Sequence, residues 1–306
     1  MKARGNRKGV GEEHAVKLQP LFFERDVHEA IWGHEEWLVS GHRSSPSVIA
    51  GGPLGGRTLE WAAAEFGRAF MGARAPFPDK FPLLFKTICA RDVLSVQVHP
   101  NETSAPRTGG EAKSEMWYML DREATLYTGL KSGAGRESVE EAVCSGRFEE
   151  LVVKRAVQPG GVVMIPGGLV HAIGAGTNVY EVQQSSDTTY RLYDWGRVGV
   201  DGRPRDLHIA EALDSIDFSL SVPEPCDRVE CPFFRFAPRD VSAPCDFPAD
   251  EETFRVLHLE RGAASIVWED GAAPLVLGRS VLVPANVAAC VEPAPFARLL
   301  VTELGK

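Results

Sequence analysis

The sequence has no apolar run of about 18 residues, the length that a membrane-spanning helix needs. Residues 1–17 are charged and lack the apolar core of a secretory signal. The six cysteines form no CxxC pair, and the spacing of Cys226, Cys231 and Cys245 matches no common zinc module. These absences predict a cytoplasmic protein with free thiols, no membrane partner, and a disordered basic tail over residues 1–17.

Positive charge is also scarce, since 33 Lys and Arg stand against 42 Asp and Glu, giving a net charge of −9. No basic stripe follows the tail, so a nucleic-acid partner is not expected. The chain does contain 30 Gly and 21 Pro, which fits a turn-rich β architecture better than a helical bundle. Its 306 residues are enough for two domains. Composition therefore predicts a mostly β protein with a few short helices.

A first group of metal-ligand residues follows the predicted strand Leu94–Val98. Gln97 and His99 are two positions apart, so their side chains lie on the same face of an extended chain. After a loop rich in Gly and Pro, Glu115 begins a second strand-like run. An amide oxygen, an imidazole nitrogen and a carboxylate are ligands of first-row metals, so these three side chains are predicted to share one site.

A second group comes from GGVVMIPGGLVHAIGAGTN, residues 160–178. The apolar strand Val162–Ile165 runs into Pro166, a Gly-Gly pair that allows positive φ, and then His171. Either histidine alone would be interpreted as an ordinary core or turn residue. Ligand types at two strand ends with matching turn chemistry instead predict a metal site. The spacing resembles the two cupin motifs, the first in modified form, and cupins are small jelly-roll barrels.

The remaining pattern predicts two domains, residues 18–217 with the metal and residues 218–306 without one. Gly278 and Pro284 repeat the spacing of Gly160 and Pro166, but Ala289 stands where the repeat would need a histidine. The second domain is therefore predicted to be a degenerate jelly-roll. Helices are expected over Thr58–Arg74, Ser138–Ser145 and Asp206–Asp217. Strands expected after residue 218 are Phe254–Leu259, Ala264–Trp268, Pro274–Leu277, Ser280–Val283 and Ala297–Val301.

Four longer stretches resemble the type I phosphomannose isomerases, in their short bacterial form with two cupin-like jelly-roll β-barrels. They are FPLLFKTICARDVLSVQVHP, KSEMWYML, VMIPGGLVHAIGAGTNVYEVQQSSDTTYRLYDWGR and LHIAEALDSID. The chain departs from the family pattern in residues 22–42, where the segment containing Trp32 and Gly33 is merged into a shorter connection. The resemblance implies an isomerase that interconverts mannose 6-phosphate and fructose 6-phosphate through an enediol.

The resemblance also implies residue roles. One Zn²⁺ per chain would be held by Gln97, His99, Glu115 and His171. Arg191 would lie at the reacting carbons, Glu181 where a general base has been proposed, and Lys113 near the sugar hydroxyls. Ser95, Lys86 and Arg197 would contact the phosphate or another part of the substrate.

Other interpretations stay open at this stage. Lys86 fits a charge at a strand end, Lys113 a solvated loop residue, and Arg197 a surface salt bridge. The chain as a whole fits an isomerase of another sugar or sugar phosphate, or a non-catalytic cupin that binds metal or sugar. A cupin dioxygenase would favour a His-rich open iron site. The expected partner is a small-molecule sugar phosphate, and both a monomer and a homodimer are compatible with the sequence.

Overall fold

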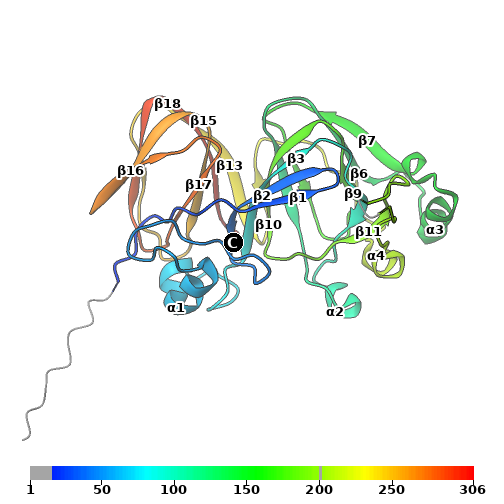
Figure 1. The fold of residues 1–306 in the computed structure, drawn as a ribbon, viewed down its shortest axis with the longest axis horizontal. Coiled ribbons are helices and arrows are strands. Elements are labelled where there is room, and N and C mark those ends of the chain that lie inside the picture. The colour runs from blue at the N-terminus through cyan, green and yellow to red at the C-terminus, as the bar shows by residue number, and fades with distance from the viewer. Residues whose placement is uncertain (1–15, 200–201) are drawn as a thin grey trace, which may run out of the picture.

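The computed structural model describes residues 16–199 and 202–306, so most of the predicted N-terminal tail lies outside the described residues. Three antiparallel sheets form the described part of the chain. Figure 1 shows the strands of the first half on one side and β13 to β18 on the other, with the C-terminus between them. The mostly β fold predicted from composition is confirmed.

The first sheet is central, because both of its faces are buried. Its strand order is β1-β2-β3-β10-β5-β8. Apolar residues alternate between two cores along the inner strands β5, β8 and β10; in β5, Tyr118 packs behind the sheet and Trp117 in front. Strands buried on both faces carry nearly continuous apolar runs, which explains FPLLFKTICA. The strands are β1 (Val27–Ala30), β2 (Gly33–Ser40), β3 (Leu83–Ala90), β10 (Thr177–Gln184), β5 (Glu115–Met119) and β8 (Val162–Ile165).

The second sheet faces the front of the first and encloses a core with it. Residues such as Ile88 and Trp117 of the first sheet meet Leu126 and Ile173 of the second. Two helices, α3 (Arg136–Ser145) and α4 (Ile209–Ser215), cover the outer face of this sheet through Val139, Leu213 and their neighbours. In strand order, its members are β11 (Tyr190–Tyr193), β4 (Val96–Val98), β9 (His171–Ile173), β6 (Ala124–Leu130) and β7 (Val152–Val157).

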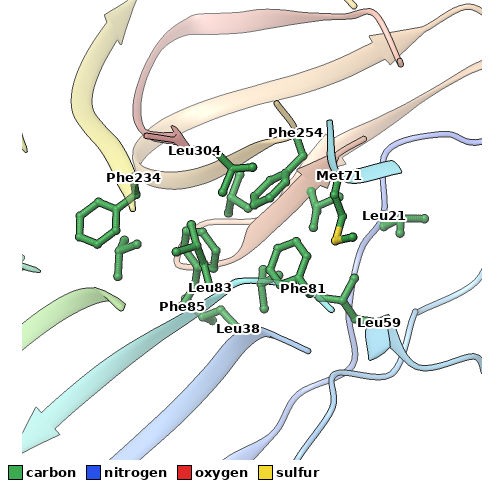
Figure 2. Packing of buried hydrophobic residues seen from close by; sticks show 14 of the residues in the cluster. Leu21, Leu38, Leu59, Met71, Phe81, Leu83, Phe85, Phe234, Phe254 and Leu304 are labelled. Carbon is green, nitrogen blue, oxygen red and sulfur yellow. The ribbon is translucent and has the colours of Figure 1, made fainter. Parts of the chain in front are cut away.

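The third sheet packs against the back of the first. Figure 2 shows Leu83, the first residue of β3, and Phe81 just before it meeting Phe254 and Leu304 across this contact. An isolated bridge between Leu21 and Leu282 also ties the N-terminal segment to this sheet. The strands are β12 (Val229–Glu230), β13 (Phe234–Val241), β18 (Ala289–Leu304), β15 (Arg255–Trp268) and β16 (Gly271–Leu275), with β14 (Cys245–Phe247) on β18 and β17 (Ser280–Val283) on β15.

The helices are short, as composition predicted. The described helices are α1 (Leu59–Met71), α2 (Ala105–Thr108), α3 (Arg136–Ser145), α4 (Ile209–Ser215) and a 3₁₀ turn at Phe148–Glu150. The expected helices at 138–145 and 206–217 are confirmed with shifts at their ends, and the one at 58–74 is present but kinked at Gly67, which has a φ of 53°. No helix in the described ranges is both long and apolar enough to cross a membrane.

Two expectations for the second half of the chain were wrong in detail. Phe254–Leu259 and Ala264–Trp268 are not separate strands but parts of β15, which passes through two irregularities in its pairing with β18. The strand expected at Ala297–Val301 is the end of a much longer β18. Bulges of this kind let a long strand bend without ending. Gly262, which lies at the second irregularity, has a positive φ of 82°. The predicted division into domains at residue 217 stays a prediction.

Candidate metal centre and active site

Three buried side chains meet at one end of the space between the first two sheets. His99, Glu115 and His171 each offer a ligand atom, and these atoms all lie within 4.8 Å of one another. In the part of the chain that the structure describes, no other such group of three His, Cys, Asp or Glu was found. Gln97 lies directly opposite His171 in the pairing of β4 with β9. The structure thus brings together all four predicted metal ligands.

The turn before His171 brings that residue into place. Gly168 has a φ of 95°, which suits glycine, and its N–H donates to the carbonyl of His99 at 2.7 Å. The Gly-Gly turn after β8 is therefore hydrogen-bonded to the residue that carries the other histidine ligand. The sequence prediction for this turn is confirmed at Gly168.

Both histidines present an unprotonated nitrogen to the centre. The Nδ1 of His99 is 2.8 Å from the carbonyl oxygen of Thr188, and that of His171 is 2.8 Å from the carbonyl oxygen of Leu169. A ring nitrogen next to a carbonyl must donate, so in each neutral ring Nε2 keeps its lone pair. These two Nε2 atoms lie 3.2 Å apart, an arrangement that a cation between them would stabilise.

The spacing of the ligand atoms fits a tetrahedral ion. Metal–ligand bonds of 2.0–2.1 Å give tetrahedron edges of about 3.3–3.4 Å. The carboxylate of Glu115 faces both rings, with one oxygen, Oε2, 3.3 Å from His99 Nε2 and the other, Oε1, 3.5 Å from His171 Nε2, so either oxygen is within about one edge length of a histidine ligand atom. The Gln97 amide nitrogen is 3.4 Å from His171 Nε2, and a half-turn of the amide puts its oxygen there instead. The donor set therefore fits a four-coordinate ion of zinc type.

Burial and charge keep these groups in the protonation states that a cation requires. Burial, followed by the Lys113 charge, lowers the pKa of His99 to about 3, and burial also lowers the pKa of His171. Burial alone would raise the pKa of Glu115. The Lys113 ammonium, 3.1 Å from Glu115 Oε2, outweighs burial and holds that pKa well below its usual range. The two histidines stay neutral and the glutamate stays charged.

A second polar cluster crosses the first sheet beside the metal ligands. Lys86 Nζ lies 3.1 Å from Glu35 Oε2 and 3.2 Å from Glu181 Oε1. Each carboxylate also accepts an indole N–H, Glu35 from Trp37 at 2.9 Å and Glu181 from Trp117 at 2.8 Å. The cluster holds three ionisable groups inside an otherwise apolar core.

The two carboxyl groups that share Lys86 differ in pKa. Burial and the charge of Glu115 raise the pKa of Glu181 to about 7. Burial would also raise the pKa of Glu35, but Lys86 and Trp37 lower it below its usual range. Two carboxyls whose surroundings separate their pKa values are suited to different protonation roles near neutral pH. Glu181 is the one able to exchange a proton there.

Arg191 and Ser95 lie next to Gln97. Arg191 is the register partner of Gln97 in β11, so the two side chains share a face. Burial, followed by the charge of Arg205, lowers the pKa of Arg191, and its Nε has no hydrogen-bond partner among the described residues. Ser95 Oγ lies 3.3 Å from the Gln97 side-chain amide, and it accepts from the amide nitrogen when the Gln97 oxygen is turned to the metal centre. Both predicted residues thus border the metal ligands.

Arg197 is placed differently. Its guanidinium contacts Asp194 at 2.5 Å and Asp92 at 3.3 Å, and it donates to the carbonyl of Val93. No described hydrogen bond or ion pair joins it to a metal ligand. The salt-bridge interpretation of Arg197 agrees with these contacts, and its substrate role stays a prediction.

Sequence reasoning missed Glu35. The signal was present, because Glu35 and Trp37 alternate along one strand, but the strand that carries their partner Lys86 lies about 50 residues further on. Only the pairing of β2 with β3, in which Trp37 faces Lys86, brings them together. The register between two strands that are far apart in sequence cannot be predicted from either segment alone.

Comparisons with known proteins agree with this geometry. The chain matches the family described as phosphomannose isomerase type I, catalytic domain, over residues 13–125. It is 30% identical over 304 residues to mannose-6-phosphate isomerase ManA of Bacillus subtilis, covering 88% of this chain and 94% of that protein. A putative mannose-6-phosphate isomerase of the same organism is 30% identical over 301 residues, with the same coverage.

A solved structure extends the similarity to the fold. The crystal structure of the mannose 6-phosphate isomerase from Bacillus subtilis superposes with a TM-score of 0.83 at 27% identity, covering 93% of this chain and 99% of that one. The similarity in sequence and in fold thus spans nearly the whole length of both proteins. The chain belongs to the type I phosphomannose isomerase family.

Proposed function

We propose that this protein interconverts mannose 6-phosphate and fructose 6-phosphate through an enediol, with one Zn²⁺ held by Gln97, His99, Glu115 and His171. The observation that carries the proposal is that the buried Nε2 atoms of His99 and His171 lie 3.2 Å apart, with the Glu115 carboxylate beside them. Family membership supplies the reaction. Two imidazoles, a carboxylate and an amide oxygen in a four-coordinate arrangement favour zinc over magnesium or calcium.

The reaction moves a proton between two adjacent carbons and needs a base and a stabiliser for developing negative charge. Zinc, when bound, supplies a fixed positive charge that polarises or positions the sugar oxygens. Glu181 is proposed as the base, since its pKa of about 7 lets it take and return a proton near neutrality. Lys86 would hold the Glu181 carboxylate in place from 3.2 Å.

Two cations are proposed to act on the sugar itself. Arg191 has a permanently charged planar group on the face of Gln97, which suits it to the oxyanion that develops in the transition state. Lys113, buried against Glu115, would contact the sugar hydroxyls. Both groups would then bind the transition state more tightly than the open sugar, which is the condition for raising kcat.

For the remaining substrate contacts we propose Ser95, Lys86 and Arg197. With the Gln97 oxygen turned to the metal, the Ser95 hydroxyl accepts from the Gln97 amide and keeps its own proton to donate to the substrate. Lys86 and Arg197 already have carboxylate partners, which a phosphate would share or replace. With a net charge of −9 for the chain, cations must be concentrated at the site to attract an anionic sugar. The protein would act in the cytoplasm on this small molecule, with no nucleic-acid partner.

The test is an isomerase assay on protein stripped with a chelator and then supplied with zinc or with no metal. Mannose 6-phosphate turnover is expected only with zinc, and His171→Ala is expected to lose zinc and activity together. A panel of other sugars and sugar phosphates, assayed beside it, would reveal a different substrate. Turnover by the metal-free protein, or full zinc content in His171→Ala, would contradict the assignment.

A further inference from the structure

The segment between the two ligands His99 and Glu115 carries Lys113 over the metal centre. We call residues 100–113 the Lys113 loop. Its far end is joined to its start by one backbone hydrogen bond, from the N–H of Lys113 to the carbonyl of Pro100 at 2.9 Å. The Lys113 ammonium is paired with Glu115 at 3.1 Å, so its position depends on that ion pair and on the contacts that hold the loop backbone.

Glu111 is the loop residue nearest Lys113 that hydrogen-bonds to the segment after β10 through its backbone. Its N–H donates to Oγ1 of Thr188 at 2.9 Å, and its carbonyl accepts from Oγ of Ser186 at 3.1 Å. Its carboxylate lies 3.3 Å from Nε2 of His42. Because Nδ1 of His42 is 3.3 Å from the N–H of Ser44 and accepts from it, Nε2 carries a proton and donates to Glu111.

The fit between the loop and the strand that follows is close. A Cβ on Gly110 would lie 2.4 Å from the Tyr190 hydroxyl oxygen and 2.6 Å from Cγ2 of Thr188. The Tyr190 hydroxyl also donates to the carbonyl of Thr108 at 3.1 Å. Residues 108–111 of the loop thus rest directly on residues 188–190.

Thr188 contacts both the metal site and the Lys113 loop. Its carbonyl oxygen accepts the Nδ1 proton of the metal ligand His99, and its hydroxyl accepts the N–H of Glu111. The first contact is made by the backbone and survives any side-chain substitution. The second depends on the hydroxyl alone. Substitution at Thr188 can therefore remove one attachment of the loop, the one next to Lys113, without removing the hydrogen bond that orients His99.

We propose that Thr188 is a positioning residue for isomerisation, whose hydroxyl holds the Lys113 loop in register with the metal ligands. The inference rests on the proposed function, because the placement of Lys113 affects the rate only if Lys113 acts on the sugar. Displacement of a catalytic group by about 1 Å is enough to lower a rate about 100-fold. Thr188 acts through Lys113 and does not touch the substrate.

The test compares Thr188→Val, which has nearly the same shape without the hydroxyl, with Thr188→Ser, which keeps it. In Thr188→Val, kcat is expected to fall about 10- to 100-fold while zinc content stays at the wild-type level. Thr188→Ser is expected to recover most of the rate. Thr103→Val is the matched control, because Thr103 lies in the same loop with an exposed side chain. Its kcat should equal that of the wild type.

Hydrogen exchange gives a readout that does not depend on activity. The amide of Glu111 is expected to exchange about fivefold faster in Thr188→Val than in the wild type or in Thr188→Ser, the effect of losing one hydrogen bond of about 1 kcal/mol. Unchanged exchange or an unchanged kcat in Thr188→Val would overturn the inference. So would equal loss of rate in both variants, or loss of zinc in Thr188→Val. An inactive, zinc-loaded wild type would instead overturn the proposed function.

Discussion

The Nε of Arg191 is buried, and within the described residues no hydrogen bond explains a structural role for it. Arg191 points to the face of Gln97. If it stabilises a developing oxyanion, Arg191→Ala should lower kcat about 10²- to 10³-fold, the cost of removing one such donor. Zinc content should stay near one per chain, since Arg191 is not a ligand.

Arg191→Lys separates charge from shape. A lysine keeps the positive charge but loses the planar fork, so we expect KM near the wild-type value and kcat still well below it. Steady-state kinetics with metal analysis on the same preparations would measure both. Wild-type turnover in Arg191→Ala would remove this residue from the reaction.

Glu181 gives a pH dependence with a definite sign. A base must be unprotonated, so kcat/KM should fall as pH drops through the pKa of Glu181, which burial and Glu115 raise to about 7. A bound divalent cation favours the charged carboxylate, so the fall lies at pH 7 or below. Glu181→Gln should lower kcat about 10²- to 10⁴-fold and abolish this acid limb. A pH–rate profile that keeps the limb in Glu181→Gln would assign it to another group.

Among the elements, helix α1 can be tested independently of catalysis. The Thr58 side chain accepts the N–H of Trp61 at 3.1 Å, and the helix buries Leu59, Phe70 and Met71 in the core shared by the first and third sheets. Thr58→Ala should lower the free energy of unfolding by about 1 kcal/mol. Thr58→Ser should restore it, and neither change should alter kcat. Urea unfolding of the three proteins would measure this, and an unchanged midpoint in Thr58→Ala would mean that the cap contributes nothing.

Elements near the metal could be predicted from sequence better than those of the third sheet. The strand before Pro166 and the one opened by Glu115 have sharp ends, because turn residues or polar ligands interrupt apolar runs, and β8 and β5 begin or end there. In β15 the polar run from Glu260 to Gly262 looks like a turn, yet the strand continues because β18 pairs along nearly all of it. Tertiary pairing overrode local preference in that strand.

The candidate site shows the same limit on prediction. The clustering of Gln97, His99, Glu115 and His171 could be predicted because each of these residues stands beside a recognisable strand end. Glu35 and Thr188 could not. Their roles arise from contacts with Lys86 and with the Lys113 loop, far apart in sequence, and their residue types are unremarkable in a strand or loop.

For the molecule as a whole, the third sheet stands directly behind the residues that line the site. Alternation along β10 puts Glu181 on the site face and Tyr180 on the opposite face, where its ring lies 4.5 Å from that of His258. We propose that residues 218–306, as a second jelly-roll domain, serve as a rigid support for the catalytic sheet. In this arrangement a domain without a metal site still constrains the geometry of the active one.

His258, which lies in this contact, makes the stability of the folded protein depend on pH. Burial, together with Arg279, lowers its pKa to about 3, and its Nδ1 is 3.1 Å from the Ser280 hydroxyl. The unfolded chain binds a proton at this residue below about pH 6.5 and the folded chain does not, so acid favours unfolding. The contribution of His258 to stability is therefore complete above pH 6.5 and is lost as pH falls toward 3. Between pH 7 and 5 the loss should be about 2 kcal/mol.

Replacing His258 by Asn, which can still hydrogen-bond to Ser280 but does not titrate, tests this prediction. His258→Asn should be less stable than the wild type at pH 7, because it loses the contact with the Tyr180 ring. Its further loss between pH 7 and 5 should be smaller than that of the wild type by about 2 kcal/mol. Thr58→Ala is the matched control, since it lowers stability without removing a titrating group and should keep the full pH dependence. Urea unfolding at both pH values measures the difference, and equal losses in His258→Asn and the wild type would mean that His258 is protonated in the folded protein.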